Sequence, residues 1–191
     1  MPFEGDPDAE AVARARHGDL RAFEDLVERY SGVVYRVAAR IVGPEEADDV
    51  SQDAFLRAYH RLDRYRGEGH FRSWLLQITH NTALSALSKR RPEPVDPGAE
   101  AGQADLLPVT RDPVTSLEGS ERRRRLESKI RMLRGEHRAV LVLRDVEGMT
   151  YEEIGTVTGM PLGSVKGRLH RARQELIDLL RRNTYDWDLP R

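Results

Sequence analysis

The sequence TYEEIGTVTGMPLGSVKGRLHRAR, residues 150–173, indicates two short helices joined by a tight turn. Thr150 and Glu153 have the spacing of a capping box, in which side chains satisfy the backbone N–H groups at the start of a helix. Gly159 is suited to end that helix in a left-handed conformation, and Pro161 cannot continue it. This stretch therefore predicts a helix-turn-helix.

The second helix of this stretch has one apolar face and one cationic face. Ser164 is expected to cap its start, and the helix is expected to run to about Leu180. Apolar residues recur at helical spacing, at Val165, Leu169, Ala172, Leu176 and Leu180. The opposite face carries Gly167, His170, Arg171 and Gln174, flanked by Lys166, Arg168 and Arg173. Such a helix suits the DNA major groove, because arginine pairs with guanine edges and flanking cations bind phosphates. The alternative is a surface helix with solvated arginines.

The composition of the 191-residue chain excludes several kinds of site. It contains no cysteine, which excludes disulfides, zinc fingers and thiol redox sensing within the chain. The net charge is only −1, but the charges are unevenly distributed: residues 163–182 are rich in Lys and Arg, whereas residues 45–53 carry acids and no base. No apolar run approaches the length of a membrane span, and the N-terminus is acidic rather than signal-like. We therefore expect a cytoplasmic protein without membrane insertion.

The pattern along the chain predicts an all-α fold, because Ala, Leu, Arg and Glu dominate and β-branched residues do not alternate. Helices are expected over 8–16, 19–41, 45–62 and 71–89, and their short connections predict a four-helix bundle. Residues 92–116 are rich in proline and acid and predict a flexible linker. Two further helices, over 117–133 and 136–146, are expected to pack beneath the helix-turn-helix and complete a second small domain.

The helix expected over 45–62 carries a second stripe beside its apolar arc. This stripe consists of Asp49, Gln52, Asp53, Leu56 and His60. Acid and amide groups beside an exposed leucine make a poor core face and resemble an interface that selects a basic partner. An ordinary solvated helix face with one exposed leucine is the alternative, and the stripe alone does not decide between them.

The segment over 64–74, RYRGEGHFRSW, interleaves aromatic residues with cations around two glycines. That composition suits single-stranded DNA, whose bases stack on aromatic rings while arginine binds the backbone. Helical spacing assigns Trp74 to the core, so contacts are expected instead at Gly67, Glu68, Gly69 and His70. The polar face of the following helix carries Ser73, Gln77, His80, Asn81 and Ser88. Asn81 either bonds base edges or is solvated.

Together these segments resemble an extracytoplasmic-function (ECF) sigma factor of bacterial RNA polymerase. The N-terminal match runs through GDLRAFEDLVERY, PEEADDVSQDAFLRAYHRL and FRSWLLQITHNTALSALSKRR. The C-terminal match is HRAVLVLRDVEGMTYEEIGTVTGMPLGSVKGRLHRARQEL. The resemblance implies two small helical domains joined by the flexible linker: sigma region 2 in residues 1–91, an acidic Pro-rich linker in 92–116, sigma region 4 in 117–182 and a C-terminal tail in 183–191.

The resemblance also implies partners for the individual residues. Core RNA polymerase, through its β′ clamp helices, is expected to bind Asp48, Asp49, Gln52, Asp53 and Leu56. Single-stranded DNA of the minus-ten element is expected to meet Arg66, Gly67, Glu68, Gly69, His70, Phe71, Ser73, Gln77 and Asn81. The minus-thirty-five element is expected to meet Ser164, Lys166, Gly167, Arg168, His170, Arg171 and Arg173, in a domain that also contacts the β flap. An anti-sigma factor is the further partner that the family implies.

The implied function is promoter recognition and DNA melting that starts transcription of a stress or envelope regulon, with no cofactor and no enzymatic chemistry. A helix-turn-helix regulator that never binds core polymerase is the alternative. It explains residues 150–173 but neither the acid-and-leucine stripe nor the aromatic loop. A metal-dependent nuclease is disfavoured, because the histidines form no paired-ligand motif such as H-E-x-x-H and are more plausible as surface or cap residues.

Overall fold

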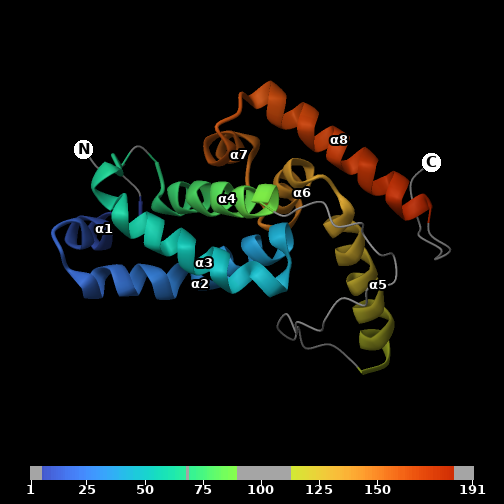
Figure 1. Ribbon diagram of the computed structural model, residues 1–191, viewed down its shortest axis with the longest axis horizontal. Helices are drawn as coiled ribbons and strands as arrows, with labels where there is room; N and C mark the ends of the chain where they lie inside the picture. The colour runs from blue at the N-terminus through green and yellow to red at the C-terminus, as the bar shows by residue number, and fades with distance from the viewer. Residues whose placement is uncertain (1–5, 68, 90–112, 183–191) are drawn as a thin grey trace.

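The computed structural model describes residues 6–67, 69–89 and 113–182, with side chains in the last range from Glu121 onward. All regular elements of these residues are helical, which confirms the predicted all-α class. Figure 1 shows that they form two modules, one on each side of the interval between α4 and α5. The expected linker residues 92–112 and the tail 183–191 lie outside the described residues.

The N-terminal module is a bundle of four helices. Its elements are α1 (Ala9–Arg16), α2 (Leu20–Val42), α3 (Pro44–His60), a short 3₁₀ turn η1 (Leu62–Arg64) and α4 (Phe71–Lys89). The Asp19 carboxylate caps α2 by accepting a hydrogen bond from Ala22 N–H at 3.2 Å. Gly43, with φ +103°, ends α2, and Pro44 opens α3 at a position where proline fits. The turn brings α3 back along α2, and both pack against α4.

The C-terminal module consists of two long helices, α5 and α8, and the shorter elements between them. Its elements are α5 (Pro113–Met132), α6 (Gly135–Leu141), a π-helical turn η2 (Val142–Val146), α7 (Tyr151–Thr158) and α8 (Leu162–Arg181). Helix α5 begins at Pro113 rather than at Leu117, so residues 113–116, which we expected in the linker, are helical. Proline is favourable there because the first helical position needs no N–H donor.

The helix-turn-helix forms largely as its sequence predicts. The Thr150 hydroxyl accepts from Glu153 N–H at 3.2 Å, and the Glu153 carboxylate accepts from Thr150 N–H at 2.7 Å, which confirms the capping box. Gly159 ends α7 with φ +70° in the left-handed region. The prediction that Ser164 caps α8 is wrong. The Pro161 carbonyl already accepts hydrogen bonds from Ser164 N–H at 2.9 Å and Val165 N–H at 3.1 Å, so α8 starts before Ser164.

The two modules pack directly against each other. Helix α4 contacts α7 and α6, and α2 contacts α5 and α6 (Figure 1). The buried Arg138 side chain of α6 donates to the Ile41 carbonyl of α2 and, at 2.9 Å, to the Leu133 carbonyl of its own module. A Cβ atom added to Gly135 would lie 2.8 Å from the Leu87 methyl group, so the start of α6 lies tightly against the end of α4. One hydrophobic core therefore runs through both modules.

The capping box gives a test of the C-terminal module. Thr150→Ala removes the acceptor for Glu153 N–H and is expected to lower the free energy of unfolding by about 1 kcal/mol. Urea unfolding followed by circular dichroism measures this loss. Thr156→Ala, in the exposed middle of the same helix, is the matched control and should be neutral or slightly stabilising, because alanine is the better helix former. Equal midpoints for wild type and Thr150→Ala would contradict the role of the cap.

Candidate functional site

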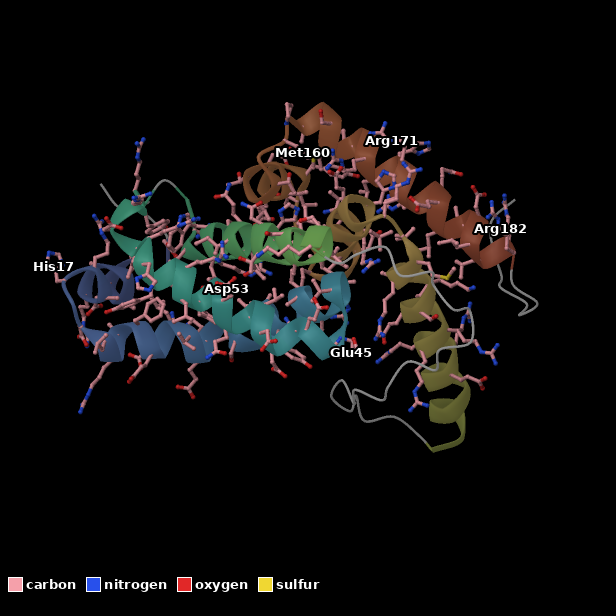
Figure 2. The ribbon with its side chains drawn as sticks, viewed as in Figure 1. His17, Glu45, Asp53, Met160, Arg171 and Arg182 are labelled. Carbon is pink, nitrogen blue, oxygen red and sulfur yellow. The ribbon has the colours of Figure 1, made fainter. Side chains whose placement is uncertain are left out.

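The acid-and-leucine stripe of α3 lies on the surface of the N-terminal module. Asp53 is partly exposed, and the other members, like the neighbouring Asp48, are exposed: Asp49, Gln52, Leu56 and His60. The Leu56 side chain is an unusual one to leave in water, with 54% of its surface accessible. The Asp53 carboxylate accepts from Arg57 Nε at 2.8 Å, one helical turn away. Figure 2 shows Asp53 on the flank of α3, away from α7 and α8. The stripe therefore lies on the surface and is not a core face.

The cationic face of α8 is exposed along the first half of the helix. Its exposed members are Ser164, Lys166, His170 and Arg171. Figure 2 shows Arg171 projecting from the outer side of α8. The Lys166 ammonium lies over the face of the Tyr151 ring, 5.7 Å from its centre. This cation–π contact links α8 to the first residue of α7. The half-buried Gly167 lies one turn before Arg171, with no side chain of its own between that guanidinium and the backbone.

Two other arginines of α8 are paired with carboxylates of the same module. Arg168 lies 2.9 Å from Glu136, and Arg173 lies 2.6 Å from Asp145. A further carboxylate of α8, that of Glu175, accepts a hydrogen bond from the His137 ring. Phosphate contacts by Arg168 or Arg173 therefore require exchange of these partners. The opposite face of α8 is apolar and buried at Val165, Leu169, Ala172 and Leu180, as predicted.

The loop before α4 depends on glycine. Gly67 has φ +71° and Gly69 has φ +119°, both in the region where side chains are strained. Arg66 and His70 are exposed on either side, whereas Glu68 lies outside the described residues. The loop therefore presents cationic and polar groups around a backbone that only glycine adopts easily.

Phe71 differs from the expectation that it contacts DNA. Its side chain is 1% exposed, and its ring lies 5.8 Å from those of Tyr30 and Tyr65 and 5.6 Å from that of Trp74. As the first residue of α4 it points into the bundle, so its ring fixes the helix and is not available to a base in this arrangement. Trp74 joins the same aromatic cluster and packs against the core, as its spacing predicts.

The C-terminal module covers part of the polar face of α4, while Asn81 and Ser88 on the same face are exposed. Ser73 and His80 are buried, and Gln77 Nε2 donates to the Thr156 carbonyl of α7 at 3.3 Å. Asn81 is exposed, and its side-chain oxygen lies 3.2 Å from His80 Nδ1. Burial lowers the pKa of His80, because the charged imidazolium loses its hydration. The expectation that His80 is a surface residue is therefore wrong, since the pattern of α4 does not reveal that α7 packs on it.

A buried carboxylate connects the two modules beside this face. Glu147, at the end of η2, has a side chain that is 5% exposed. It accepts from Arg36 of α2 at 3.2 and 3.3 Å and lies 3.9 Å from Arg72 of α4. Sequence patterns did not identify this ion cluster, because its members are far apart along the chain and none belongs to a motif.

The described residues show no sign of a metal site. No group of three or more His, Asp or Glu side chains among them is arranged to hold a metal ion. None of the helices in the described part of the chain is both long enough and apolar enough to cross a membrane. The surfaces considered for binding are therefore the acid-and-leucine stripe of α3, the cationic face of α8 and the glycine loop before α4.

Two family models match the chain, one in each module. The model of sigma-70 region 2 matches residues 26–93, and the model of sigma-70 region 4 matches residues 123–176. Among curated relatives, the RNA polymerase sigma-H factor of Pseudomonas aeruginosa is 35% identical over 88% of this chain and 91% of its own. The ECF RNA polymerase sigma factor SigW of Bacillus subtilis is 32% identical, over 89% and 95%. The ECF RNA polymerase sigma-E factor of Escherichia coli is 35% identical, over 86% and 90%.

Solved structures resemble both modules together. CnrH in complex with the cytosolic domain of CnrY has a TM-score of 0.67 and 29% identity, covering 94% of this chain and 100% of that one. The sigma factor RpoE in complex with the anti-sigma factor NepR, from Bartonella quintana, has a TM-score of 0.63 over 84% and 98%. The latter is 22% identical and supports the fold alone.

Glu147 gives a test of the contact between the modules. Glu147→Gln removes the charge that Arg36 and Arg72 share and is expected to favour separation by about 1 kcal/mol, a small value because the arginines are partly solvated. The chain has no cysteine of its own. The substitutions Glu28→Cys in α2 and Asp178→Cys in α8 therefore provide the only two thiols, to which a donor dye and an acceptor dye are attached. Energy transfer between the dyes should fall in Glu147→Gln. Glu152→Gln, an exposed site on α7, is the control with the same charge change. Unchanged transfer in Glu147→Gln would contradict the role of the cluster.

Proposed function

The chain belongs to the extracytoplasmic-function (ECF) sigma factors of bacterial RNA polymerase, and on that basis we propose that it binds core polymerase, recognises the minus-thirty-five and minus-ten elements and promotes DNA melting. One observation carries the proposal: a single chain exposes an acid-and-leucine stripe on α3 and a cationic helix-turn-helix face on α8. By the family resemblance, the genes served form a stress or envelope regulon.

Docking to core polymerase is assigned to the α3 stripe. Asp48, Asp49, Gln52 and Asp53 surround Leu56, and the partner is the pair of β′ clamp helices. An apolar anchor supplies contact area, while the surrounding acids select a basic partner and raise the rate of encounter. The second polymerase contact, to the β flap, belongs to the C-terminal module.

Reading of the minus-thirty-five element is assigned to α8. Lys166, His170 and Arg171 enter the major groove beside Gly167, and Ser164 lies at the groove end of the helix. Arg168 and Arg173 exchange Glu136 and Asp145 for phosphates on binding. Each arginine that pairs with two acceptors of a guanine contributes about 1–3 kcal/mol of discrimination.

Capture of the unpaired minus-ten strand is assigned to the loop 66–70 and to α4. Ser73, Gln77 and Asn81 extend this surface, whereas Phe71 supports it from the core. Because α7 covers part of the α4 face, the modules separate before the strand binds there. Unstacking a base costs a few kcal/mol, which contacts in the loop and along α4 offset.

A protein inhibitor is the further partner that we propose. The similar CnrH structure, at 29% identity, is a complex with a second protein, the cytosolic domain of CnrY. An anti-sigma factor that holds the modules together would keep the α4 face covered, and its release would expose that face. This mode of inhibition requires no change in either DNA-reading surface.

Run-off transcription tests the proposal as a whole. Purified core polymerase together with this chain is expected to yield a promoter-specific transcript, and neither component should yield it alone. A chain that binds promoter DNA but gives no transcript with core polymerase would instead be a helix-turn-helix regulator, and the proposal would be wrong.

Leu56 tests the docking surface. Leu56→Ala is expected to weaken binding to core polymerase at least several-fold, because it removes the apolar anchor of the stripe, and to leave binding of the minus-thirty-five duplex unchanged. Surface plasmon resonance with immobilised core enzyme measures the affinity. Leu20→Ala is the matched control, since Leu20 is an equally exposed leucine, at 58% against 54%, on a different helix. The stripe would lose its assignment if both variants bound core enzyme as wild type does.

Arg171 tests the reading helix. Arg171→Ala is expected to weaken binding of a cognate promoter by about 1–3 kcal/mol more than binding of a scrambled duplex. The reason is that the substitution removes a contact that discriminates between bases. Electrophoretic mobility shift with holoenzyme at fixed salt measures both duplexes. Arg182→Ala, beyond the far end of α8 (Figure 2), removes the same charge and should lower the two affinities equally if at all. Equal losses on the two duplexes for Arg171→Ala would assign it to phosphate contact.

A further inference from the structure

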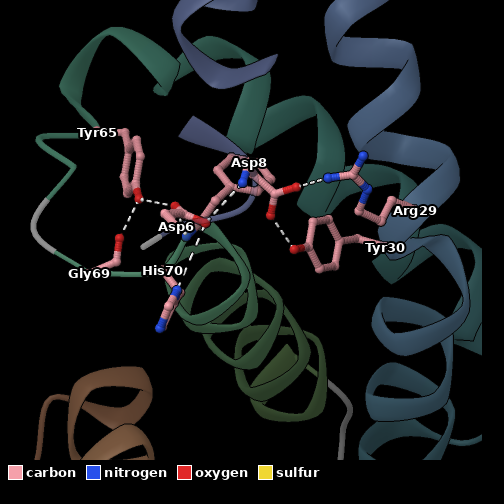
Figure 3. Close-up of polar contacts among 8 residues, drawn as sticks. Asp6, Asp8, Arg29, Tyr30, Tyr65, Gly69 and His70 are labelled. Atoms are coloured by element: carbon pink, nitrogen blue, oxygen red, sulfur yellow. Dashed lines mark hydrogen bonds and ion pairs between the residues drawn. The ribbon is translucent and has the colours of Figure 1, made fainter. Parts of the chain in front are cut away.

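A buried carboxylate from the N-terminal end of the chain lies behind the glycine loop. Asp6, just before α1, is 9% exposed. Its Oδ2 accepts from Phe71 N–H at 2.9 Å and from the Tyr65 hydroxyl at 3.1 Å, and its Oδ1 accepts from Asp8 N–H at 3.2 Å. His70 Nδ1 lies 3.9 Å from the same Oδ1 (Figure 3). One carboxylate thus contacts residues on both sides of the loop 66–69.

The two bonds to Oδ2 fix the two ends of this loop. Phe71 is the first residue of α4, so its N–H needs an acceptor, and a negative charge is favourable at that end of the helix. The single hydrogen of the Tyr65 hydroxyl is shared between Asp6 Oδ2 and the Gly69 carbonyl, which lies 2.5 Å from the hydroxyl oxygen. Burial and the Asp6 charge raise the pKa of Tyr65, which keeps the hydroxyl protonated as a donor. The loop is therefore closed by hydrogen bonds at its start and at its end.

Asp6 is itself held in place by its neighbour. The Asp8 side chain is completely buried and accepts hydrogen bonds from Arg29 and Tyr30 of α2. The Tyr30 ring in turn packs 5.8 Å from the Phe71 ring. This second network joins the N-terminal turn to the bundle, so Asp6 approaches the loop from a rigid support (Figure 3).

We propose that Asp6 is a positioning residue, which holds Tyr65 and residues 69–71, on the two sides of the glycine loop, in the arrangement that receives an unpaired base of the minus-ten strand. This inference rests on the proposed function and extends it to a residue that makes no DNA contact itself. A loop closed at both ends before binding loses less conformational freedom when the strand arrives, so affinity is higher. Asp6 also faces His70, whose exposed ring is one of the expected base contacts.

The test compares two helix-capping aspartates in holoenzyme assembled from core polymerase and the full chain. Asp6→Ala opens the loop, whereas Asp19→Ala removes the cap of α2 and its ion pair with Arg14, away from the loop. The probe is a fluorescent single-stranded oligonucleotide with the non-template minus-ten sequence of a mapped promoter. Asp6→Ala is expected to weaken strand binding on the order of tenfold. Asp19→Ala should bind the strand as wild type does, and both variants should retain core binding.

A second readout follows the loop without DNA. Trp74 lies 5.2 Å from Tyr65 and 5.6 Å from Phe71, ring centre to ring centre, so its emission reports the aromatic cluster beneath the loop. In a Trp187→Phe background, iodide should quench Trp74 more strongly in Asp6→Ala than in Asp19→Ala. Tyr65→Phe removes the hydroxyl but keeps the α4 cap, and it should shift quenching and strand affinity in the same direction by a smaller factor. This variant replaces Asp6→Ala if the latter fails to fold.

The outcomes distinguish a failure of the Asp6 inference from a failure of the proposed function of the loop. Equal strand binding by wild type and Asp6→Ala, or by wild type and Tyr65→Phe if that variant is used, overturns the inference alone. An equal loss in Asp19→Ala also overturns it, because the effect would then be general destabilisation. If wild-type holoenzyme does not bind the strand, the assignment of the loop under the proposed function is wrong, and the inference fails with it.

Discussion

Helix α4 is packed on two sides, and the arrangement of the whole chain depends on this. Phe71 packs on Tyr30 of α2, while Gln77 donates to the Thr156 carbonyl of α7, and Leu75, Leu76 and His80 are buried. Buried polar groups on such a helix need partners; Thr79 donates to the Leu75 carbonyl at 3.0 Å. A purely apolar second side would pack as well but would have no donors for a nucleic acid. Under the proposed function, this face serves two environments, one covered by protein and one open to a charged strand.

Features that depend on neighbouring residues were predictable from the sequence, and those that depend on distant residues were not. The capping box at Thr150, the Asp19 cap and the exposed Leu56 stripe follow from spacing within one or two helical turns. The start of α8 does not follow from spacing, because Pro161 and Ser164 are both plausible N-cap residues. The hydrogen bonds that the Pro161 carbonyl accepts from Ser164 N–H and Val165 N–H show that Pro161 is the N-cap. The Arg36–Glu147 contact and the burial of His80 arise from packing between modules, which leaves no periodic signal.

The charges of the two modules are arranged so that one binding surface stays open while another is covered. The α3 acids Asp48 and Asp49 are exposed, whereas on the polar face of α4 Ser73 and His80 are buried and Gln77 donates to the Thr156 carbonyl of α7. Within the C-terminal module, Glu136 and Asp145 pair with the two arginines that lie nearest to the packed side of α8. The side chains of His170 and Arg171 are exposed and accessible to an external partner. Under the proposed function, docking and strand capture are subject to separate structural controls.

The packing of α7 on α4 acts as an internal competitor for whatever binds α4. Because both helices belong to one chain, the competitor is present at a fixed effective concentration, of the order of millimolar for short tethers, and dilution does not remove it. The observed affinity for a ligand of the α4 face then equals the intrinsic affinity multiplied by the open population. A chain whose internal contacts are all intact therefore binds a ligand of the α4 face weakly, until another molecule increases the open population.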